Sequence, residues 1–339
     1  MMGKLIIIVV VAIVTVLNLS EGKPPKVEKL PDVQVFKPGI YPITLIEVNE
    51  SSSIPIQIYT PNITTSFPVL LFLHGACLEN SYYSTILQFV ASYGYIVVAP
   101  QLYSCDVFVG PVSGTREVEI AANVTNWLSD DLNSVLPGLT TANLKQVTIG
   151  GHGRGGKTAF ALALGHSPIS LSIQFAALIG LDPVAGAGKD NEDNPKILTY
   201  IPQSFDLSIP VTVIGTGYGN QTNWCLICPV CAPNDVNHDE FYKETKAPVG
   251  HIVTTDYGHV DILDDGLEGI MGWVTNIKCK NGDGPKDKLR TTVAGTMVAF
   301  LNAYFNGFDL DYMMILQRPG VTPVTVFTES VFQDRYAQL

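Results

Sequence analysis

The amino-acid sequence predicts an α/β fold in which a mostly parallel β-sheet is flanked by helices. Short, apolar, β-branched runs alternate along the chain with segments of helical periodicity, a pattern typical of parallel sheets covered by helices. The 339 residues are 46% hydrophobic, which suits one large globular domain of this class. A strand-like run that leads through a glycine-rich turn into a helix-like segment is the third indication.

Individual elements follow from the periodicity of the apolar residues. Strands are predicted for the runs Val69–Leu73, Tyr95–Ala99, Lys145–Ile149, Phe175–Leu181 and Val211–Gly215, and Gly250–Thr254 is β-like. Helices are predicted for Ser81–Tyr93, Arg116–Leu132, Lys157–Leu164 and Thr291–Phe305. Two irregular spans, 182–207 and 216–236, are expected to be functional or lid-like loops, because long loops inside a compact domain usually are.

The N-terminus has the pattern of a secretory signal peptide. Lys4 precedes the apolar run Leu5–Leu17, which is shorter than the roughly 20 residues that a membrane-spanning helix needs. Small residues follow, and cleavage is predicted near Gly22. An uncleaved anchor or a buried helix is the alternative. Cleavage would send the chain through the secretory pathway, to the extracellular space, the apoplast or the vacuole, without an integral membrane span.

Four segments are therefore predicted along the chain. Residues 1–22 form the signal peptide, and the polar, proline-bearing residues 23–38 form an N-terminal arm. Residues 39–318 form the α/β domain, and residues 319–339 form a C-terminal tail.

Charge, sequons and cysteines narrow the class of protein further. The formal net charge of −11, without an offsetting lysine/arginine cluster, argues against nucleic-acid binding and leaves a small-molecule or protein partner as the expectation. Glycosylation sequons begin at Asn49, Asn62, Asn123 and Asn220, although sequons also occur by chance.

The six cysteines are expected to form disulfides in an oxidising compartment. Cys225, Cys228 and Cys231 have a metal-like spacing, but no second Cys/His pair at matching spacing completes a zinc site. No metal and no cofactor are therefore expected.

The glycine-rich turn has the form of a nucleophile elbow without its nucleophile. The stretch Gly150–Gly156 reads GGHGRGG and lies between the predicted strand Lys145–Ile149 and the predicted helix Lys157–Leu164. In α/β-hydrolases this strand–turn–helix carries a serine at the centre of G-x-S-x-G. Here the central residue is Gly153, which has no side chain.

Other parts of a hydrolase site are present in the expected chain order of nucleophile, acid and histidine. Asp182 follows the predicted strand Phe175–Leu181, and His259 follows the β-like segment Gly250–Thr254. A turn residue before proline and a surface-loop histidine are the alternative interpretations. The backbone N–H groups of Ala76, after the strand Val69–Leu73, and of Arg154 are candidates for an oxyanion hole.

With these residues in place, the sequence resembles the plant chlorophyllases, α/β-hydrolases that cleave the phytyl ester of chlorophyll. Five of the six residues of the family motif G-H-S-R-G-G are present, and so are the segments ALIGLDPVAG (177–186), CAPNDVNHDEFYKE (231–244) and YGHVDILDD (257–265). The likeness runs from about Val35 to about Gln317. It implies that Asp182 and His259 match the acid and the histidine of the family's triad, and that Gly153 stands where the family has its serine.

Three functions remain open at this point. Without the serine, the Asp182–His259 pair could act as a general acid/base in cyclisation, isomerisation, elimination or carbonyl addition on an apolar plant metabolite. The pocket could instead hold a ligand without catalysis, as in a binding protein or a pseudoenzyme. Residual carboxylic ester hydrolysis would need a water molecule activated directly by His259.

Overall fold

A computed structural model describes residues 32–49, 52–105, 110–222, 230–246, 248–267 and 279–331. The predicted signal peptide, Cys225 and Cys228 lie outside these residues. From Val33 onward the chain forms one compact unit. In the described part of the chain, no helix is long and apolar enough to cross a membrane.

Nine strands of the described residues form one sheet with the order β1-β2-β4-β3-β5-β6-β7-β8-β9. Their bounds are Ile43–Val48 (β1), Ile56–Pro61 (β2), Ser66–Leu73 (β3), Ile96–Pro100 (β4), Thr141–His152 (β5), Ala177–Leu181 (β6), Val211–Thr216 (β7), Val249–Thr254 (β8) and Val326–Val331 (β9). The pairings from β4 through β3, β5, β6 and β7 to β8 are parallel. The edges are antiparallel, with β1 and β2 at one edge and β9 at the other.

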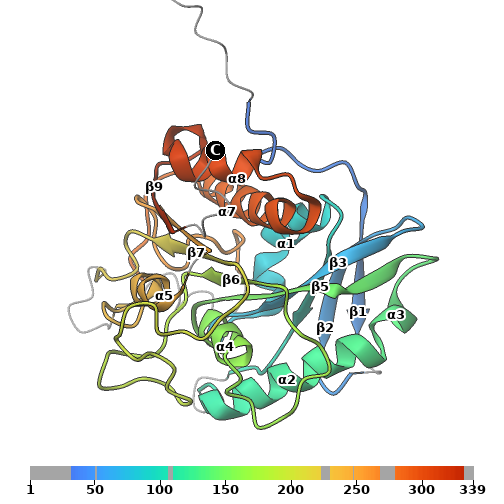
Figure 1. Cartoon of the computed structure of the whole chain (residues 1–339), viewed down its shortest axis with the longest axis horizontal. Helices are drawn as coiled ribbons and strands as arrows, with labels where there is room; N and C mark the ends of the chain where they lie inside the picture. The colour runs from blue at the N-terminus through green and yellow to red at the C-terminus, as the bar shows by residue number, and fades with distance from the viewer. Residues whose placement is uncertain are drawn as a thin grey trace, which may run out of the picture. The chain divides into compact units, whose positions relative to one another are not determined.

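Helices cover both faces of the sheet. The main ones are α1 (Ser84–Ala91), α2 (Gly114–Asp130), α4 (Gly153–Ala163), α5 (His238–Glu244), α7 (Lys286–Leu301) and α8 (Leu310–Gln317). Helices α1, α7 and α8 lie on one face, and α2 and α4 on the other (Figure 1). Shorter turns are η1 (Asn80–Tyr83), α3 (Leu132–Val135), η2 (Asn302–Asn306) and η3 (Pro319–Val321). The predicted mostly parallel α/β sheet is confirmed.

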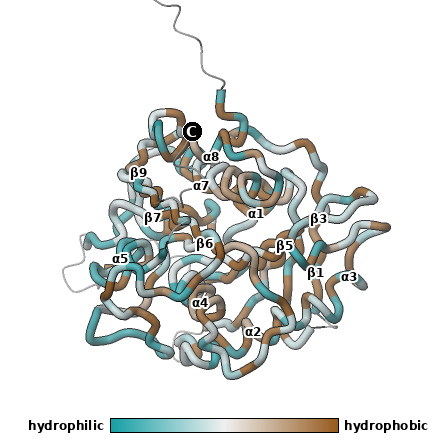
Figure 2. Tube along the Cα trace, viewed as in Figure 1, coloured by the Kyte–Doolittle hydropathy of each residue, from teal (hydrophilic) through white to brown (hydrophobic). Residues whose placement is uncertain are grey.

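The hydrophobic core is divided by the sheet into two layers. One layer packs residues of α2 and α4 against the strands, and the other packs α1, α7 and α8. Strands β4, β6 and β7 are buried along their whole length, as expected for parallel strands covered on both faces. The hydropathy trace in Figure 2 accordingly shows its apolar segments gathered in the central strands.

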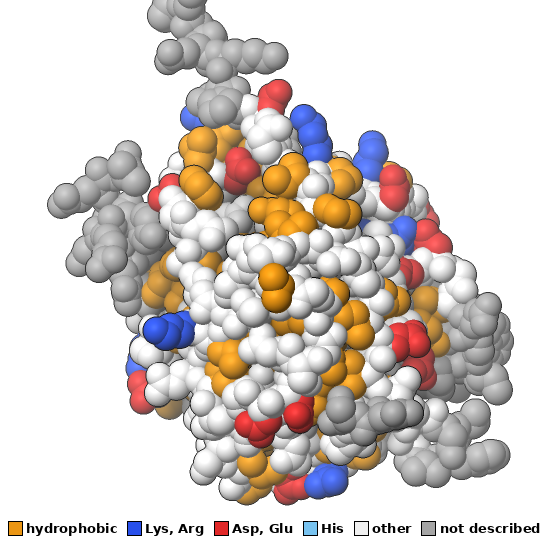
Figure 3. All heavy atoms as spheres, turned by 90° about the vertical axis from the view of Figure 1, so that its right-hand side faces the viewer, with side chains coloured by type: hydrophobic (Ala, Val, Ile, Leu, Met, Phe, Trp, Pro, Cys, Tyr) orange, Lys and Arg blue, Asp and Glu red, His pale blue; other side chains and the backbone are white. Residues whose placement is uncertain are grey.

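The charged side chains visible on the face that Figure 3 shows do not gather by sign. On that face lysines and arginines are dispersed among acidic and uncharged residues. This distribution provides no basic stripe there of the kind that neutralises phosphates.

Two segments predicted outside the domain contact its core. Val35, in the predicted N-terminal arm, is buried, and the ring of Phe36 lies against Gly295 of α7. In the predicted C-terminal tail, β9 pairs with β8 over its full length. Both segments therefore add to the compact unit that carries the site.

Candidate active site

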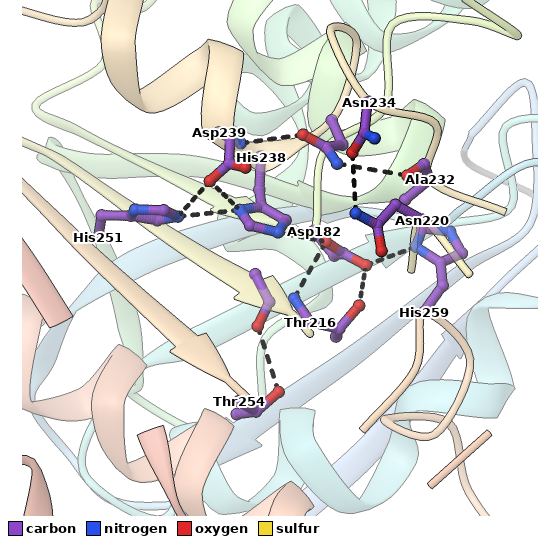
Figure 4. Close-up of polar contacts among 12 residues, drawn as sticks. Asp182, Thr216, Asn220, Ala232, Asn234, His238, Asp239, His251, Thr254 and His259 are labelled. Carbon is purple, nitrogen blue, oxygen red and sulfur yellow. Dashed lines mark hydrogen bonds and ion pairs between the residues drawn. The ribbon is translucent and has the colours of Figure 1, made fainter. Parts of the chain in front are cut away.

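The candidate residues lie at the carboxyl ends of neighbouring parallel strands, where ligands of open α/β sheets bind. Strand β5 ends at His152 and α4 begins directly with Gly153, so the predicted glycine-rich turn is a sharp junction without an intervening loop. Asp182 follows β6 and Thr216 ends β7. The segment after β8 brings His259 back to the same edge (Figure 4).

Gly153 has a backbone conformation that side chains rarely adopt. Its φ is +54°, and a Cβ built there would lie 3.0 Å from Nε2 of His259. A contact of this length requires the imidazole to move by a few tenths of an ångström. The ring of His259 therefore lies over the place where a side chain at position 153 would begin.

Asp182 and His259 form the pair that the sequence predicts to be close. Nδ1 of His259 donates to Oδ2 of Asp182 over 2.8 Å, which leaves Nε2 on the side of Gly153. The Asp182 carboxylate is fully buried, whereas the His259 side chain is 12% exposed. An orienting carboxylate on Nδ1 and a partly open Nε2 is the arrangement of a general base.

Further donors hold the Asp182 carboxylate in its ionised form. The hydroxyl of Thr216 donates to Oδ2 over 2.6 Å, and the Thr216 N–H donates to Oδ1 over 3.2 Å. Burial alone would raise the pKa of Asp182, but the hydrogen bond and charge of His259, with the help of His238 and Thr216, lower it to about 2. The acid thus stays negative over the whole physiological pH range.

His152 connects the loop that carries His259 to the elbow. Its Nε2–H donates to the carbonyl oxygen of His259 over 3.0 Å, so its Nδ1 accepts from the hydroxyl of Tyr83 over 2.8 Å. The Tyr83 oxygen in turn accepts the N–H of Gly75 over 2.9 Å. Burial, with the nearby His259, holds the pKa of His152 well below its ordinary value, so the imidazole is neutral. His152 therefore positions the His259 backbone without carrying charge.

His74 fixes the segment that bears Ala76. Its Nε2 accepts the N–H of Leu102 over 3.0 Å, and its Nδ1–H donates to the carbonyl oxygen of Gly75 over 2.8 Å. Burial lowers the pKa of His74 to about 4, so this residue also remains neutral. The turn after β3 is thereby anchored beside the elbow.

Arg154 contributes its backbone at the elbow and its side chain at the pocket rim. As the second residue of α4, it has an N–H without a partner inside the helix. Its guanidinium Nε lies 3.0 Å from Oε2 of the buried Glu117 and 3.2 Å from Oδ2 of Asp193. These ion pairs hold the side chain beside α2.

A cavity of about 490 Å³ adjoins the site and is lined in part by its residues. Its wall is mostly apolar and includes Ala76, Arg154, Val184, His259 and Val260. Two disulfides, Cys77–Cys105 and Cys231–Cys279, border it, which confirms the expected pairing for the described cysteines. A cavity of this size suits a small organic molecule.

Some contributors to the site are absent from the sequence prediction. Thr216, His152, Tyr83 and His238 all support the pair. Their signals were visible in part: Thr216 directly follows a predicted strand, and His152 lies inside the glycine-rich motif. Their partners are far away in the sequence, so no local pattern reveals the contact.

The asparagines of the four sequons are all exposed.

The sheet order, the elbow and the acid–histidine pair define an α/β-hydrolase. A family model described as chlorophyllase matches residues 32–332. The chain belongs to the chlorophyllase family.

Curated relatives agree with this family. Chlorophyllase-1 of Arabidopsis thaliana is 46% identical over 295 residues, which cover 85% of this chain and 89% of that relative. Chlorophyllase type 0 of Chenopodium album is 42% identical over 325 residues, with 92% and 91% covered. A relative in Citrus unshiu, named Chlorophyllase-1, chloroplastic, is 44% identical over 298 residues, with 86% of each chain covered.

Proposed function

We propose that this chlorophyllase-like protein has lost the covalent serine step and uses the Asp182–His259 pair as a general acid/base on a small, mostly apolar substrate. One observation carries the proposal: Nε2 of His259 lies 3.0 Å from the Cβ position of residue 153, and His259 also lines the cavity. A substrate atom can therefore approach the base without an intervening serine.

The proposed step is a proton transfer within a bound substrate. Nε2 of His259 takes a proton from a hydroxyl, an amine or an activated C–H, and the Asp182 carboxylate stabilises the resulting imidazolium. The N–H groups of Ala76 and Arg154 stabilise the alkoxide or enolate that forms. The imidazolium then returns the proton to another substrate atom, which completes a cyclisation, isomerisation, elimination or carbonyl addition.

Other hydroxyl groups are poor replacements for the serine. Thr148 is fully buried within β5, and Ser167 lies beyond the end of α4. Neither can occupy a position that the elbow backbone defines. Loss of a triad serine typically costs on the order of 10⁶ in turnover. Ordinary acyl-serine ester cleavage is therefore not the proposed activity.

A second candidate is residual ester hydrolysis, which the names of the chlorophyllase relatives favour. In this case His259 would activate a water molecule for direct attack on the ester. A third is ligand binding without turnover, for which the mostly apolar wall of the cavity is the support.

We further propose that the mature chain follows the secretory pathway, on the pattern of residues 1–22.

The test is incubation of purified protein with a metabolite extract of the source tissue, followed by untargeted mass spectrometry. Proton-transfer catalysis predicts that a substrate is converted into an isomer, or into a product that has lost or gained a small molecule. This conversion should disappear with His259→Ala and with Asp182→Ala. Hydrolysis predicts products that together exceed the substrate by the mass of water. A binding protein would retain a compound without converting it, and both variants would retain it with modest loss at most. Such retention would contradict the catalytic proposal.

A further inference from the structure

A second cluster of histidine and carboxylate groups lies behind Asp182, on the side away from His259. His238 is the first residue of α5, Asp239 follows it, and His251 lies on β8. Both imidazoles are buried, whereas the Asp239 side chain is 53% exposed. Figure 4 shows the three side chains converging on one another. The proposed function uses none of the three as a reacting group.

Three ligand atoms of this cluster have the spacing of a metal site. Nδ1 of His238 lies 2.9 Å from Nε2 of His251. Oδ1 of Asp239 lies 3.4 Å from Nδ1 of His238 and 3.9 Å from Nε2 of His251. The point in their common plane that is equidistant from these three atoms lies about 2.0 Å from each. A tetrahedral ion lies out of that plane and slightly farther from each atom, which still matches zinc–nitrogen and zinc–carboxylate bond lengths of about 2.0–2.2 Å.

The outer nitrogens of both rings face carboxylates. Nε2 of His238 lies 4.0 Å from Oδ1 of Asp182, and Nδ1 of His251 lies 3.4 Å from Oε2 of Glu329 on β9. Histidines that bind a metal generally direct their other N–H to a carboxylate or a carbonyl group. The cluster has this arrangement at His251, whose Nδ1 forms a hydrogen bond with Glu329, and at a longer distance at His238.

Without a metal, one particular pair of neutral tautomers satisfies these contacts. Nδ1–H of His251 donates to Glu329 over 3.4 Å, so its Nε2 accepts the Nδ1–H of His238 over 2.9 Å. A metal ion would require His238 to carry its proton on Nε2, which faces Asp182 at 4.0 Å, so that Nδ1 can bind the ion. Both inner nitrogens and Oδ1 of Asp239 would then direct lone pairs at the ion.

We propose that His238, Asp239 and His251 bind a divalent transition-metal ion of the zinc type, with water in a fourth position. Two imidazoles and one carboxylate form a ligand set that zinc accepts. The exposed side of Asp239 provides the entry path from solvent. The site goes beyond the proposed function, since it needs neither catalysis nor a substrate. It also differs from the expectation, based on the spacing of the cysteines, that the chain binds no metal.

The sequence does not reveal this site, because its residues belong to two different elements. His238 and Asp239 begin a short helix, and His251 lies on a strand that pairs with β7. Gly215 of β7 allows the approach, because a Cβ there would lie 2.4 Å from the His238 ring. The ring of Tyr242 stacks on His251 with centroids 4.7 Å apart. Gly215 thus leaves room for the His238 ring, and Tyr242 packs against the His251 ring.

The experiment is a Co²⁺ titration of tag-free, disulfide-intact full-length protein after chelator treatment. The expected result is one bound equivalent with the intense visible absorption of tetrahedral Co²⁺, which Zn²⁺ displaces. Asp239→Asn should weaken binding by about tenfold or more, because an amide oxygen is a poorer ligand than a carboxylate. His251→Gln should abolish the tetrahedral absorption.

Two controls keep this test decisive. Asp206→Asn makes the same change at an exposed aspartate far along the chain from the cluster, and should leave the Co²⁺ affinity unchanged. If His251→Gln fails to fold, Asp239→Asn decides alone, since its side chain is half exposed. Absence of tetrahedral absorption in the unmodified protein would overturn the site. Binding that persists unchanged in Asp239→Asn would do the same, because the ion would then lie elsewhere.

Discussion

In the proposed function, the residue at position 153 determines which chemistry the site can perform, and here that residue is Gly153. The elbow gives this residue a φ of +54°, and the imidazole of His259 lies over the space that a side chain would fill. Glycine adopts this conformation without strain, whereas a side chain there costs about 1–3 kcal/mol. The sharp junction of β5 and α4, which in α/β-hydrolases carries a nucleophilic side chain, is thus present here with a glycine at its centre.

The proposed function predicts that a hydroxyl introduced at position 153 gives the site a gain in ester hydrolysis. Gly153→Ser is expected to raise hydrolysis of a small activated ester by on the order of 10²-fold, well below the ~10⁶ of a complete triad, because the His259 ring must first shift. The matched control Gly153→Ala carries the same strain without the hydroxyl and should show no gain. Initial rates with a nitrophenyl acetate measure the difference. Equal rates in both variants would mean that the histidine or the oxyanion donors are misaligned.

Thr216 provides a test of how the acid is held. Its hydroxyl donates to Oδ2 of Asp182 over 2.6 Å, and hydrogen bonds to charged groups contribute about 1.5–3 kcal/mol. Thr216→Val should therefore lower the free energy of unfolding at neutral pH by about this amount. Thr216→Ser, which keeps the hydroxyl, should recover most of it. Urea unfolding measures both, and an equal loss in the two variants would indicate lost packing instead.

At the scale of elements, the site depends on loops that a disulfide joins. Cys231 precedes α5, Cys279 precedes α7, and both border the cavity that His259 lines. Their bond closes a loop of 48 residues. A covalent link of this kind restricts the unfolded chain and holds two cavity walls together.

Removal of this disulfide should destabilise the fold. The double variant Cys231→Ala/Cys279→Ala is expected to lose about 2–4 kcal/mol in the free energy of unfolding, by the loop-closure argument. Denaturant unfolding under oxidising conditions measures it. A parallel double variant at Cys77 and Cys105, which closes 28 residues, should lose somewhat less. An unchanged unfolding midpoint for both variants would contradict a structural role for these bonds.

Sequence patterns identified the parallel strands and missed the elements that complete the sheet and the second cluster. Strands β3 to β8 form apolar runs that local periodicity reveals. Strand β9 (VFTESV) contains polar residues that interrupt an apolar run, and it gains its structure from antiparallel pairing with β8. Helix α5 has only 7 residues, too few to show helical periodicity. Asp182 and His259 were predicted from chain order, but Thr216 and His238 contact them only through tertiary packing.

For the whole molecule, the buried neutral histidines predict a loss of stability in acid. The pKa of His74 falls from 6.5 to about 4 on burial, and the pKa of His152 is also lowered. Between these pH values the unfolded chain binds more protons than the folded chain, so stability is full above pH 6.5 and decreases toward pH 4. The melting temperature should fall progressively over this window. His74→Gln should make the fall shallower, and an identical pH dependence would assign it to other groups.

The central claim is that this chlorophyllase-family fold has a working acid–histidine pair and no acyl-accepting serine. Intact-mass analysis after treatment with a fluorophosphonate probe tests it most directly, because the probe labels activated serines. The account predicts no adduct on the unmodified protein and one adduct on Gly153→Ser. A stoichiometric adduct on the unmodified protein, at any residue, would contradict it.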